Sequence, residues 1–475
     1  FDDSKMPVSA LNAIPARVAD FLPDSMILQT YLRKFVVARL ITTLFSVSVA
    51  VVIFIWARKL YGDTAGFLAL SLYIFDPNII AHSQLVTTDI YAAGTILFAT
   101  FWLWKYANQR SFRNGLICAF FLGLSLVAKY TSVVLLPLFV LALVIYDWLN
   151  AKKTENLAKI LQWIVLAGVV CLLVINIAFL FNRSFAKLED YRFRSELFEQ
   201  LRAVPVLRSL LIPVPYPFLQ GLDWVYAREQ SGEGYGRIYL LGELRENQGF
   251  AGYYFVAFLL KVPIATQIII GLSFLALFMK RHYENIRRDE LFLFIPIIFF
   301  VIYFNFLYKA QIGLRFYLVI FPLLFVFAGG LLKDWLSFNA VQKRAFDLLC
   351  IYLVVSTLSY YPHFLTYFNE IVWNRKTAYK YLADSNIDWG QGGLYLREYL
   401  VANPDVFRAP SYPEPGTFII SANDLVGIWT WKEADTFSWL RNNFTPVGSV
   451  ANQYLIFEIT PEAYNALCDT TVYCQ

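Results

Sequence analysis

The sequence predicts an α-helical polytopic membrane protein with a small α/β domain at its C-terminal end. The chain has 475 residues, of which 58% are hydrophobic and 18% aromatic, and its mean hydropathy is +0.52. Such values exclude an ordinary soluble domain. Apolar runs long enough to enter a bilayer recur up to residue 362. Beyond that residue, short helical and strand patterns alternate, as they do in α/β domains, and strands are predicted at 416–421 and 453–459.

About ten apolar segments are predicted to be transmembrane helices, because each approaches the roughly 20 residues that a span requires. They form one block within 36–181 and a second within 253–362. The individual segments lie near residues 36–57, 64–81, 90–105, 114–129, 132–148, 160–181, 253–279, 291–308, 316–333 and 345–362.

The charges of the short loops predict the orientation of these helices. Five short loops on one side contain fifteen lysines and arginines, whereas the short loops on the opposite side contain three. Basic residues accumulate in cytoplasmic loops, so the second side is predicted to be extracytoplasmic. Three larger pieces then lie outside: residues 1–35 as the latter part of a first outer loop, 182–252 as a large outer loop with interfacial helices, and 363–475 as the α/β domain. A complete protein is expected to have one more span before Phe1.

Several charged residues fall at helix ends on the predicted outer side. Ionisable groups at membrane depth are costly and usually mark a functional site. Arg315, Lys129, Arg39 and Lys309 are candidates for binding a donor phosphate, and Asp89 is the candidate pocket acid. The alternatives are structural, since Asp89 also suits the start of a helix and the lysine side chains can reach the interface without a ligand.

A dense polar segment in the C-terminal domain is a candidate substrate-binding surface. It contains Asp384, Asn386, Asp388, Trp389 and Gln391. Carboxylates and amides can bind sugar hydroxyls, and the indole can stack on a sugar ring. The alternative is a capped helix start with a buried Trp389. Glu243, in a glycine-rich outer loop, is a further candidate ligand, although a lone glutamate in such a loop is more often solvated.

The remaining motifs exclude several classes of protein. Neither the cysteines nor the histidines have metal-ligand spacing, and there is no Walker loop or dinucleotide fingerprint, so no metal and no cofactor are predicted. The bases lie in short loops between apolar runs, which indicates membrane orientation rather than nucleic-acid binding. Cys468 and Cys474 are expected to form a disulfide if the tail lies in an oxidising compartment.

Six segments occur in an order and spacing that resemble a known family. They are Leu85–Asp89, Gly123–Thr131, Tyr239–Glu243, Leu260–Pro263, Ile312–Tyr317 and Asp384–Gln391. Together they resemble the family 39 glycosyltransferases, the protein O-mannosyltransferase-like group with the GT-C fold, in a bacterial-type branch. The resemblance implies a multi-pass protein of the bacterial inner membrane that takes a sugar from a polyprenyl-phosphate donor and transfers it to an acceptor at the outer face.

The chain departs from the family pattern near its start. The resemblance implies a catalytic Asp-Glu pair in the first outer loop, followed by a His-Pro-Pro signature, but Lys5-Met6-Pro7 stands at that position. The pair is therefore expected upstream of Phe1, and the catalytic acid is not assigned. The alternative function is a non-catalytic membrane subunit that keeps the glycosyltransferase fold and supports partner subunits of a larger complex. A transporter is disfavoured because no interrupted spans of the inverted-repeat kind are recognisable.

Overall fold

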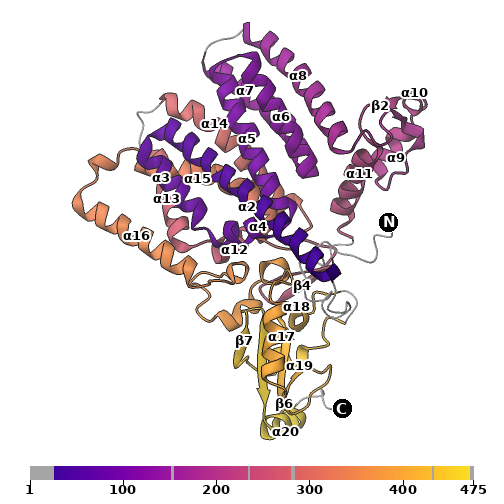
Figure 1. The fold of residues 1–475 in the computed structure, drawn as a ribbon, viewed down its shortest axis with the longest axis vertical. Coiled ribbons are helices and arrows are strands. Elements are labelled where there is room, and N and C mark those ends of the chain that lie inside the picture. The colour runs from indigo at the N-terminus through magenta and orange to yellow at the C-terminus, as the bar shows by residue number, and fades with distance from the viewer. Residues whose placement is uncertain (1–25, 151–154, 234–235, 280–283, 430–432, 471–475) are drawn as a thin grey trace.

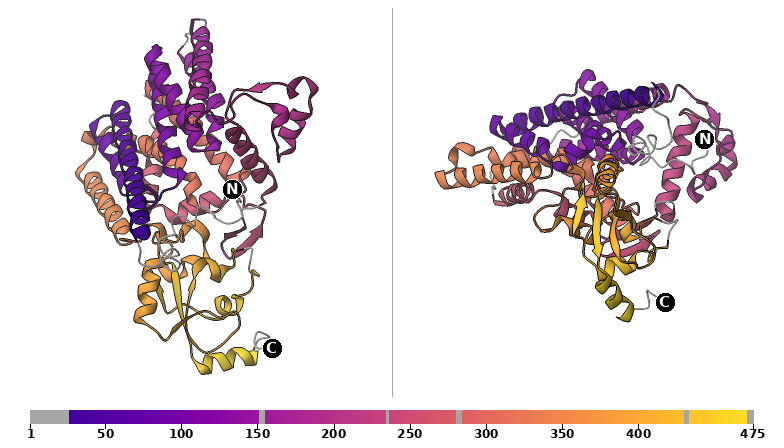
Figure 2. Two further views of the ribbon diagram at one scale, coloured as in Figure 1. Left: turned by 45° about the vertical axis from the view of Figure 1, so that its right-hand side comes forward. Right: turned by 60° about the horizontal axis from the view of Figure 1, so that its bottom comes forward.

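The structure is a computed structural model that describes residues 26–150, 155–233, 236–279, 284–429 and 433–470 (Figure 1). A body of long helices occupies one end of the molecule, and a domain with a central sheet occupies the other. A smaller unit of short helices and strands projects from the side of the helical body (Figure 2). The predicted fold class, a helical polytopic membrane protein with a small α/β domain, is confirmed.

The helical body is built from two blocks of sequence. The first block contains α2 (Met26–Tyr61), α3 (Asp63–Ile74), α4 (Pro77–Gln84), α5 (Thr88–Asn108), α6 (Phe112–Ala128), the 3-10 helix η1 (Tyr130–Val134), α7 (Leu135–Leu149) and α8 (Glu155–Ala178). The second contains α12 (Tyr253–Lys261), α13 (Ile264–Met279), α14 (Glu284–Ile302), the π-helical turn η3 (Tyr303–Leu307), the 3-10 helix η4 (Leu314–Ile320), α15 (Phe321–Gly329) and α16 (Ala340–Leu358). The α5 helix is almost wholly buried, and it packs against α2, α6 and η4.

The described residues contain fewer regular spans than the ten that the sequence predicts. Five helices are long and apolar enough to cross a membrane, or up to seven if each of two bent pairs is one span. Segments 64–81 and 253–279 correspond to these pairs, α3–α4 and α12–α13, which are bent by 62° and 117°. Segment 114–129 is the shorter apolar helix α6, and segments 90–105 and 345–362 form α5 and α16, which carry charged residues within their length. The expectation of uninterrupted spans was therefore wrong at two places.

Local chemistry explains both breaks. At the first, the Asp76 carboxylate caps α4 by accepting hydrogen bonds from the backbone N–H groups of Asn78 and Ile79 at 2.9 and 3.0 Å. Pro77 occupies the first turn of α4, where its missing N–H costs nothing. At the second, Pro263 cannot continue α12, because it has no N–H to donate to the Leu259 carbonyl. The Asn369 side chain donates to that carbonyl at 2.6 Å and to the Val262 carbonyl at 2.8 Å.

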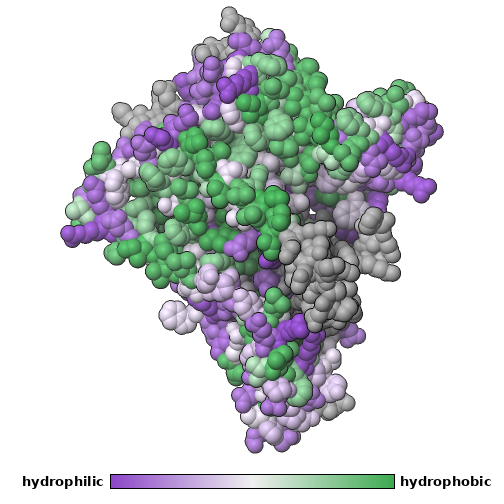
Figure 3. All heavy atoms as spheres, in the orientation of Figure 1, coloured by the Kyte–Doolittle hydropathy of each residue, from purple (hydrophilic) through white to green (hydrophobic). Residues whose placement is uncertain are grey.

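The outer surface of the helical body suits a lipid environment. On the face shown in Figure 3, hydrophobic residues, coloured green, cover much of the helical body, whereas hydrophilic residues gather at its ends and over the C-terminal domain. On α8, exposed apolar side chains recur every four residues, which places them on one helical stripe. They are Leu161, Val165, Val169, Leu173 and Ile177. Such a stripe in contact with water would be unfavourable, so it faces lipid.

We expect Gly94→Ala to destabilise the protein, because side chains of α2 lie directly against this residue of α5. A methyl group at Gly94 would lie 2.5 Å from the Val49 side chain and 2.6 Å from the Phe45 ring. Overpacking of this kind typically costs about 1–3 kcal/mol. Gly168→Ala in α8 is the matched control, because no atom lies within 4 Å of the added methyl group. Thermal unfolding of both variants in one detergent tests this, and equal midpoints would contradict it.

The C-terminal domain is a four-stranded sheet with helices packed around it. The strand order is β5 (Val406–Arg408), β6 (Gly416–Ser421), β8 (Tyr454–Ile459) and β7 (Gly448–Val450). The first pair is parallel and the other two are antiparallel, with Gly416 opposite Ile459 in the central pair. The helices are α17 (Gly393–Ala402), α18 (Ala422–Val426), α19 (Ser438–Asn443) and α20 (Pro461–Thr470). Cys474, the predicted partner of Cys468, lies outside the described residues.

The lateral unit and a hairpin come from residues 182–252. The unit contains β1 (Ala186–Lys187), α9 (Glu196–Ala203), α10 (Pro205–Arg208), β2 (Leu211–Ile212) and α11 (Tyr216–Ser231). The hairpin pairs β3 (Arg237–Leu240) with β4 (Glu243–Glu246) and touches the C-terminal domain through a bridge from Leu240 to Leu382. Residues 182–252 therefore contact the C-terminal domain through this bridge, and they contact the helical body where the Tyr303 hydroxyl donates to Glu229 of α11.

Candidate functional site

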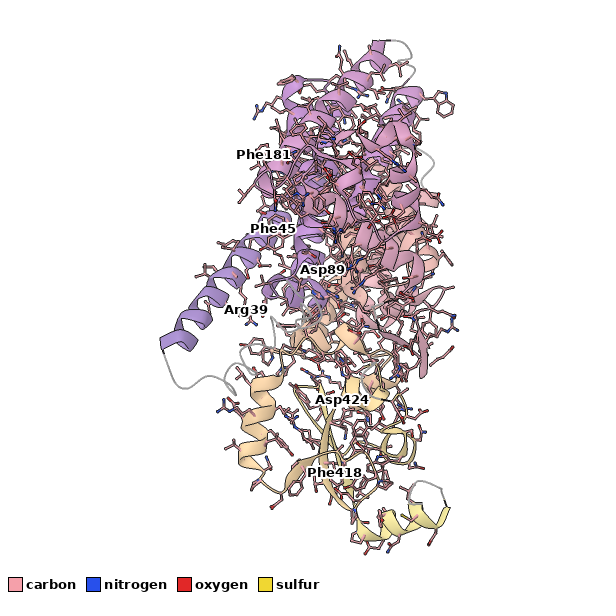
Figure 4. The ribbon with its side chains drawn as sticks, turned by 90° about the vertical axis from the view of Figure 1, so that its right-hand side faces the viewer. Arg39, Phe45, Asp89, Phe181, Phe418 and Asp424 are labelled. Atoms are coloured by element: carbon pink, nitrogen blue, oxygen red, sulfur yellow. The ribbon has the colours of Figure 1, made fainter. Side chains whose placement is uncertain are left out.

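Three charged residues from separate elements meet where the helical body faces the C-terminal domain. Asp89 lies in the first turn of α5, Lys129 follows the end of α6, and Arg315 lies in the first turn of η4. Figure 4 shows Asp89 at the end of the helical body, above the domain that holds Phe418 and Asp424. Lys129 is 40 positions from Asp89 in the sequence and Arg315 is 226 positions from it, so the fold brings distant residues together.

The Asp89 carboxylate is the centre of this cluster. One of its oxygens accepts a hydrogen bond from Lys129 Nζ at 2.8 Å, and the other lies 3.5 Å from an Arg315 terminal nitrogen. The Asp89 side chain is only 1% exposed, and those of Lys129 and Arg315 are 11% and 13% exposed. Thr87 occupies the N-cap position of α5 and makes no side-chain capping bond. Asp89 therefore binds two cations and does not simply cap the helix.

The cluster has an excess positive charge. Two cations share one carboxylate, so the three groups together carry one net positive charge. Arg315 Nε is buried and has no hydrogen-bond partner among the described residues. The Phe316 ring lies 4.1 Å from Lys129 Nζ, and the Trp389 ring lies 4.3 Å from the Arg315 guanidinium carbon. Aromatic walls exclude water and strengthen electrostatic attraction, so an anion would be stabilised here.

The predicted sugar-binding segment is mostly engaged within the protein. The Asn386 side chain accepts from the Leu314 N–H at 3.0 Å and donates to the Tyr253 hydroxyl at 2.9 Å. The Gln391 side chain accepts from the Trp389 N–H at 2.6 Å and donates to the Ile387 carbonyl at 2.8 Å. Trp389 is itself buried. Residues 384–391 therefore connect the C-terminal domain to the helical body, and Trp389 lies against the charged cluster.

The two acids of this segment have raised pKa values. Burial raises the pKa of Asp384 to about 7, and the positive charge of Arg315 only partly opposes this shift. Burial also raises the pKa of Asp388, which accepts a hydrogen bond from the Gly390 N–H at 2.6 Å. Asp384 has a φ angle of 57°, a left-handed conformation that aspartate and asparagine tolerate better than most residues.

We expect Asp384→Asn to stabilise the protein at neutral pH and not at pH 4. Between the unfolded pKa of about 3.9 and the folded pKa of about 7, the folded state binds more protons, so wild-type stability falls as the pH rises. Asparagine keeps the oxygen that accepts from the Ser385 N–H at 2.6 Å but carries no charge. Melting temperatures of both proteins from pH 4 to pH 8 test this, because other titrating groups cancel in the difference. A difference that does not grow with pH would contradict it.

The other predicted ligands lie outside the cluster. Lys309 donates to the Gln230 carbonyl at the end of α11, and Glu243 forms an exposed ion pair with Arg245 at 2.8 Å. Arg39 lies on the part of α2 that projects from the helical body (Figure 4), where its guanidinium carbon lies 4.4 Å from the Phe35 ring centroid. Of the four predicted phosphate-binding residues, only Lys129 and Arg315 contact Asp89 in the described structure.

Four polar residues near the cluster were not assigned from the sequence. Lys261 and Asp76 are buried at the two helix breaks, and Lys261 Nζ donates to the Leu365 carbonyl at 2.7 Å. His82 lies within electrostatic range of Asp89. Glu229 of α11 accepts from the Tyr303 hydroxyl at 2.5 Å, and its burial raises its pKa. The position of Lys261 within an apolar run could have marked it as functional. Asp76, His82 and Glu229 have no such signal, because in the sequence they resemble ordinary helix-end or loop residues.

A comparison with protein families supports the resemblance seen in the sequence. Residues 27–179, which include Asp89 and Lys129, match the family model of dolichyl-phosphate-mannose-protein mannosyltransferases. This match confirms the resemblance to the family 39 glycosyltransferases over that part of the chain. Residues 27–179 are therefore similar to this mannosyltransferase family, and the long apolar helices among the described residues are those of a multi-pass membrane protein.

Solved structures with low sequence identity also align with the chain. ArnT from Cupriavidus metallidurans bound to undecaprenyl phosphate is 13% identical, with 90% of this chain and 84% of that chain covered and a TM-score of 0.43. The same protein in the apo state is 11% identical over the same shares, with a TM-score of 0.38. An oligosaccharyltransferase from Archaeoglobus fulgidus, tethered to an acceptor peptide, is 12% identical, with 74% of this chain and 45% of that chain covered and a TM-score of 0.42. A comparison with curated proteins gave no match.

Proposed function

We propose that the protein transfers a sugar from a polyprenyl-phosphate donor to an acceptor at the membrane face where Asp89, Lys129 and Arg315 meet. The observation that carries the proposal is the buried carboxylate shared by two cations, with Arg315 Nε left without a hydrogen-bond partner among the described residues. The family match supports the reaction class. On this proposal the protein is a bacterial inner-membrane protein whose cluster and C-terminal domain lie on the extracytoplasmic side.

The cluster would bind the phosphate of the donor. Arginine presents a planar fork to phosphate oxygens, and lysine adds a point charge. Asp89 holds both cations in place and neutralises only one of their two positive charges. The polyprenyl chain would lie along the apolar surface of the helical body, and the sugar would extend towards the polar C-terminal domain. This arrangement matches a ligand with one apolar end, one charged centre and one polar end.

The same cations would assist the transfer step. The acceptor oxygen forms a bond to the anomeric carbon as the bond from that carbon to the phosphate oxygen breaks, and negative charge then grows on the departing polyprenyl phosphate. Arg315 and Lys129 would stabilise this charge because they are already oriented towards it. A general base must take the acceptor's proton. Asp89 is unsuited to that role, since both of its oxygens face cations.

The second candidate function is a non-catalytic one, and it follows from Lys5-Met6-Pro7, which stands where the family resemblance implies His-Pro-Pro. A membrane subunit that kept the phosphate site but lacked the base would bind a polyprenyl phosphate without transferring a sugar. It would then serve partner subunits of a larger complex. Binding and transfer must therefore be measured separately.

The test uses the full chain in phosphatidylcholine nanodiscs. We expect undecaprenyl phosphate to bind, and to compete with a labelled polyprenyl-phosphate sugar, with transfer or slow hydrolysis of the sugar detected by chromatography. Binding without any turnover would favour the non-catalytic subunit. Failure of the wild-type protein to bind undecaprenyl phosphate would contradict both functions.

A further inference from the structure

We infer that Asn386 of the C-terminal domain is a positioning residue for Arg315, so that the phosphate site depends on the docking of that domain. The inference rests on the proposed function, because it assigns Arg315 to phosphate binding. It concerns a residue that does not contact the phosphate itself. Its support lies in the hydrogen bonds between residues 384–389 and the start of η4.

The Asn386 side chain is 1% exposed, and both ends of its amide are used. Its oxygen accepts from the backbone N–H of Leu314, the residue before Arg315, at 3.0 Å. Its nitrogen donates to the Tyr253 hydroxyl at 2.9 Å and to the Ala383 carbonyl at 3.0 Å. The first N–H groups of a helix have no partner within it. Asn386 therefore supplies, from another domain, the hydrogen bond that fixes the first turn of η4.

Ser385 makes a second attachment beside the first. Its backbone N–H donates to the Ile312 carbonyl at 3.1 Å, and its hydroxyl donates to the same carbonyl. The Asn386 carbonyl in turn accepts a hydrogen bond from buried Lys261 at the break between α12 and α13. The backbone on both sides of Gly313 is thus held by a segment that is itself held by Lys261.

Gly313 makes this close approach possible. Its φ angle is 149°, and a Cβ atom there would lie 2.2 Å from Ser385 Oγ and 3.2 Å from the Ser385 carbonyl carbon. A side chain at this position would therefore push the two segments apart. The contact is tight enough to transmit the position of residues 384–389 to the start of η4.

The Arg315 side chain is held by the same segment. Its guanidinium carbon lies 4.3 Å from the ring centroid of Trp389, which is buried with Leu85 and Phe364 in a small cluster between the domains. Asp89 lies 3.5 Å from a terminal nitrogen of the same guanidinium. Because a long side chain loses conformational freedom when it binds a ligand, an Arg315 that is already oriented binds phosphate more tightly.

The test compares Asn386→Ala with Tyr253→Phe. The first removes the bond to Leu314, and the second removes only the Tyr253 bond and leaves the bond to Leu314 intact. We expect Asn386→Ala to raise the Kd for undecaprenyl phosphate in nanodiscs by about tenfold, and Tyr253→Phe to change it less than about twofold. Both changes are expected to lower the melting temperature. Equal changes in Kd, or no change in either variant, would overturn the inference.

A double variant separates this inference from the proposed function. If Asn386 acts through Arg315, adding Asn386→Ala to Arg315→Ala should not raise the Kd further, whereas additive effects would overturn the inference. An unchanged Kd in Arg315→Ala alone would instead contradict the proposed phosphate site. If Asn386→Ala does not fold, Ser385→Ala removes one hydrogen bond of the same contact and is expected to raise the Kd about threefold. An unchanged Kd in that variant would also count against the inference.

Discussion

Arg315→Ala is expected to weaken donor binding more than any other single change at the cluster. The guanidinium is 13% exposed and lies at the end of the helical body, where a lipid phosphate would be partly desolvated. Loss of a charge-assisted hydrogen bond in such a place typically costs about 1.5–3 kcal/mol, which corresponds to a Kd raised by about 10- to 100-fold. The measurement is the dependence of sugar transfer on donor concentration, together with the Kd for undecaprenyl phosphate.

Two further variants test whether the loss of donor affinity comes from the Arg315 side chain itself. Arg315→Lys keeps the charge but loses the planar fork, so we expect an intermediate loss of affinity. Asp384→Ala removes a neighbouring acid and should affect the acceptor or domain packing, with a smaller effect on donor affinity than Arg315→Ala. If Arg315→Ala leaves the donor dependence unchanged while Asp384→Ala raises the donor requirement, the phosphate site has been misplaced.

Asp89→Asn is expected to cause the largest loss of stability. The carboxylate is 1% exposed and compensates two buried cations, so its removal leaves Lys129 and Arg315 without a counter-charge. Breaking a buried ion pair in this way typically costs about 3–5 kcal/mol. Thermal unfolding in detergent measures the loss. Asp63→Asn is the matched control, because Asp63 pairs with Arg58 at the surface and such pairs contribute about 0–1 kcal/mol.

A second change tests whether uncompensated charge causes that loss. Adding Lys129→Gln to Asp89→Asn removes one of the two stranded cations, so the double variant should be more stable than Asp89→Asn alone. If the double variant is less stable than the single one, the lysine contributes through packing against Phe316 and the electrostatic explanation fails.

Hydropathy and periodicity were sufficient for the fold class and for the main strands of the C-terminal domain. The strand predicted at 416–421 is β6, and the strand predicted at 453–459 is β8. These features depend on local sequence, since a buried strand or an apolar helix has a recognisable pattern of its own. The two helix breaks were missed because apolar content alone does not distinguish a bent pair of helices from one continuous span, although Pro77 and Pro263 lie at the breaks. The contacts that hold the second bend come from a distant residue, Asn369, which donates to the carbonyls at the end of α12.

The sequence by itself determined that this is a membrane protein with charged residues at the ends of its helices, because apolar length and charge are properties of short segments. Only the tertiary structure decided which of those charges meet. Lys129 and Arg315 converge on Asp89, whereas Lys309 and Arg39 do not. The structure also decided the role of Asn386, since an amide has the same donors and acceptors whether it binds a sugar or a backbone. Its location against Leu314 follows from the docking of two domains, and the local sequence does not contain that information.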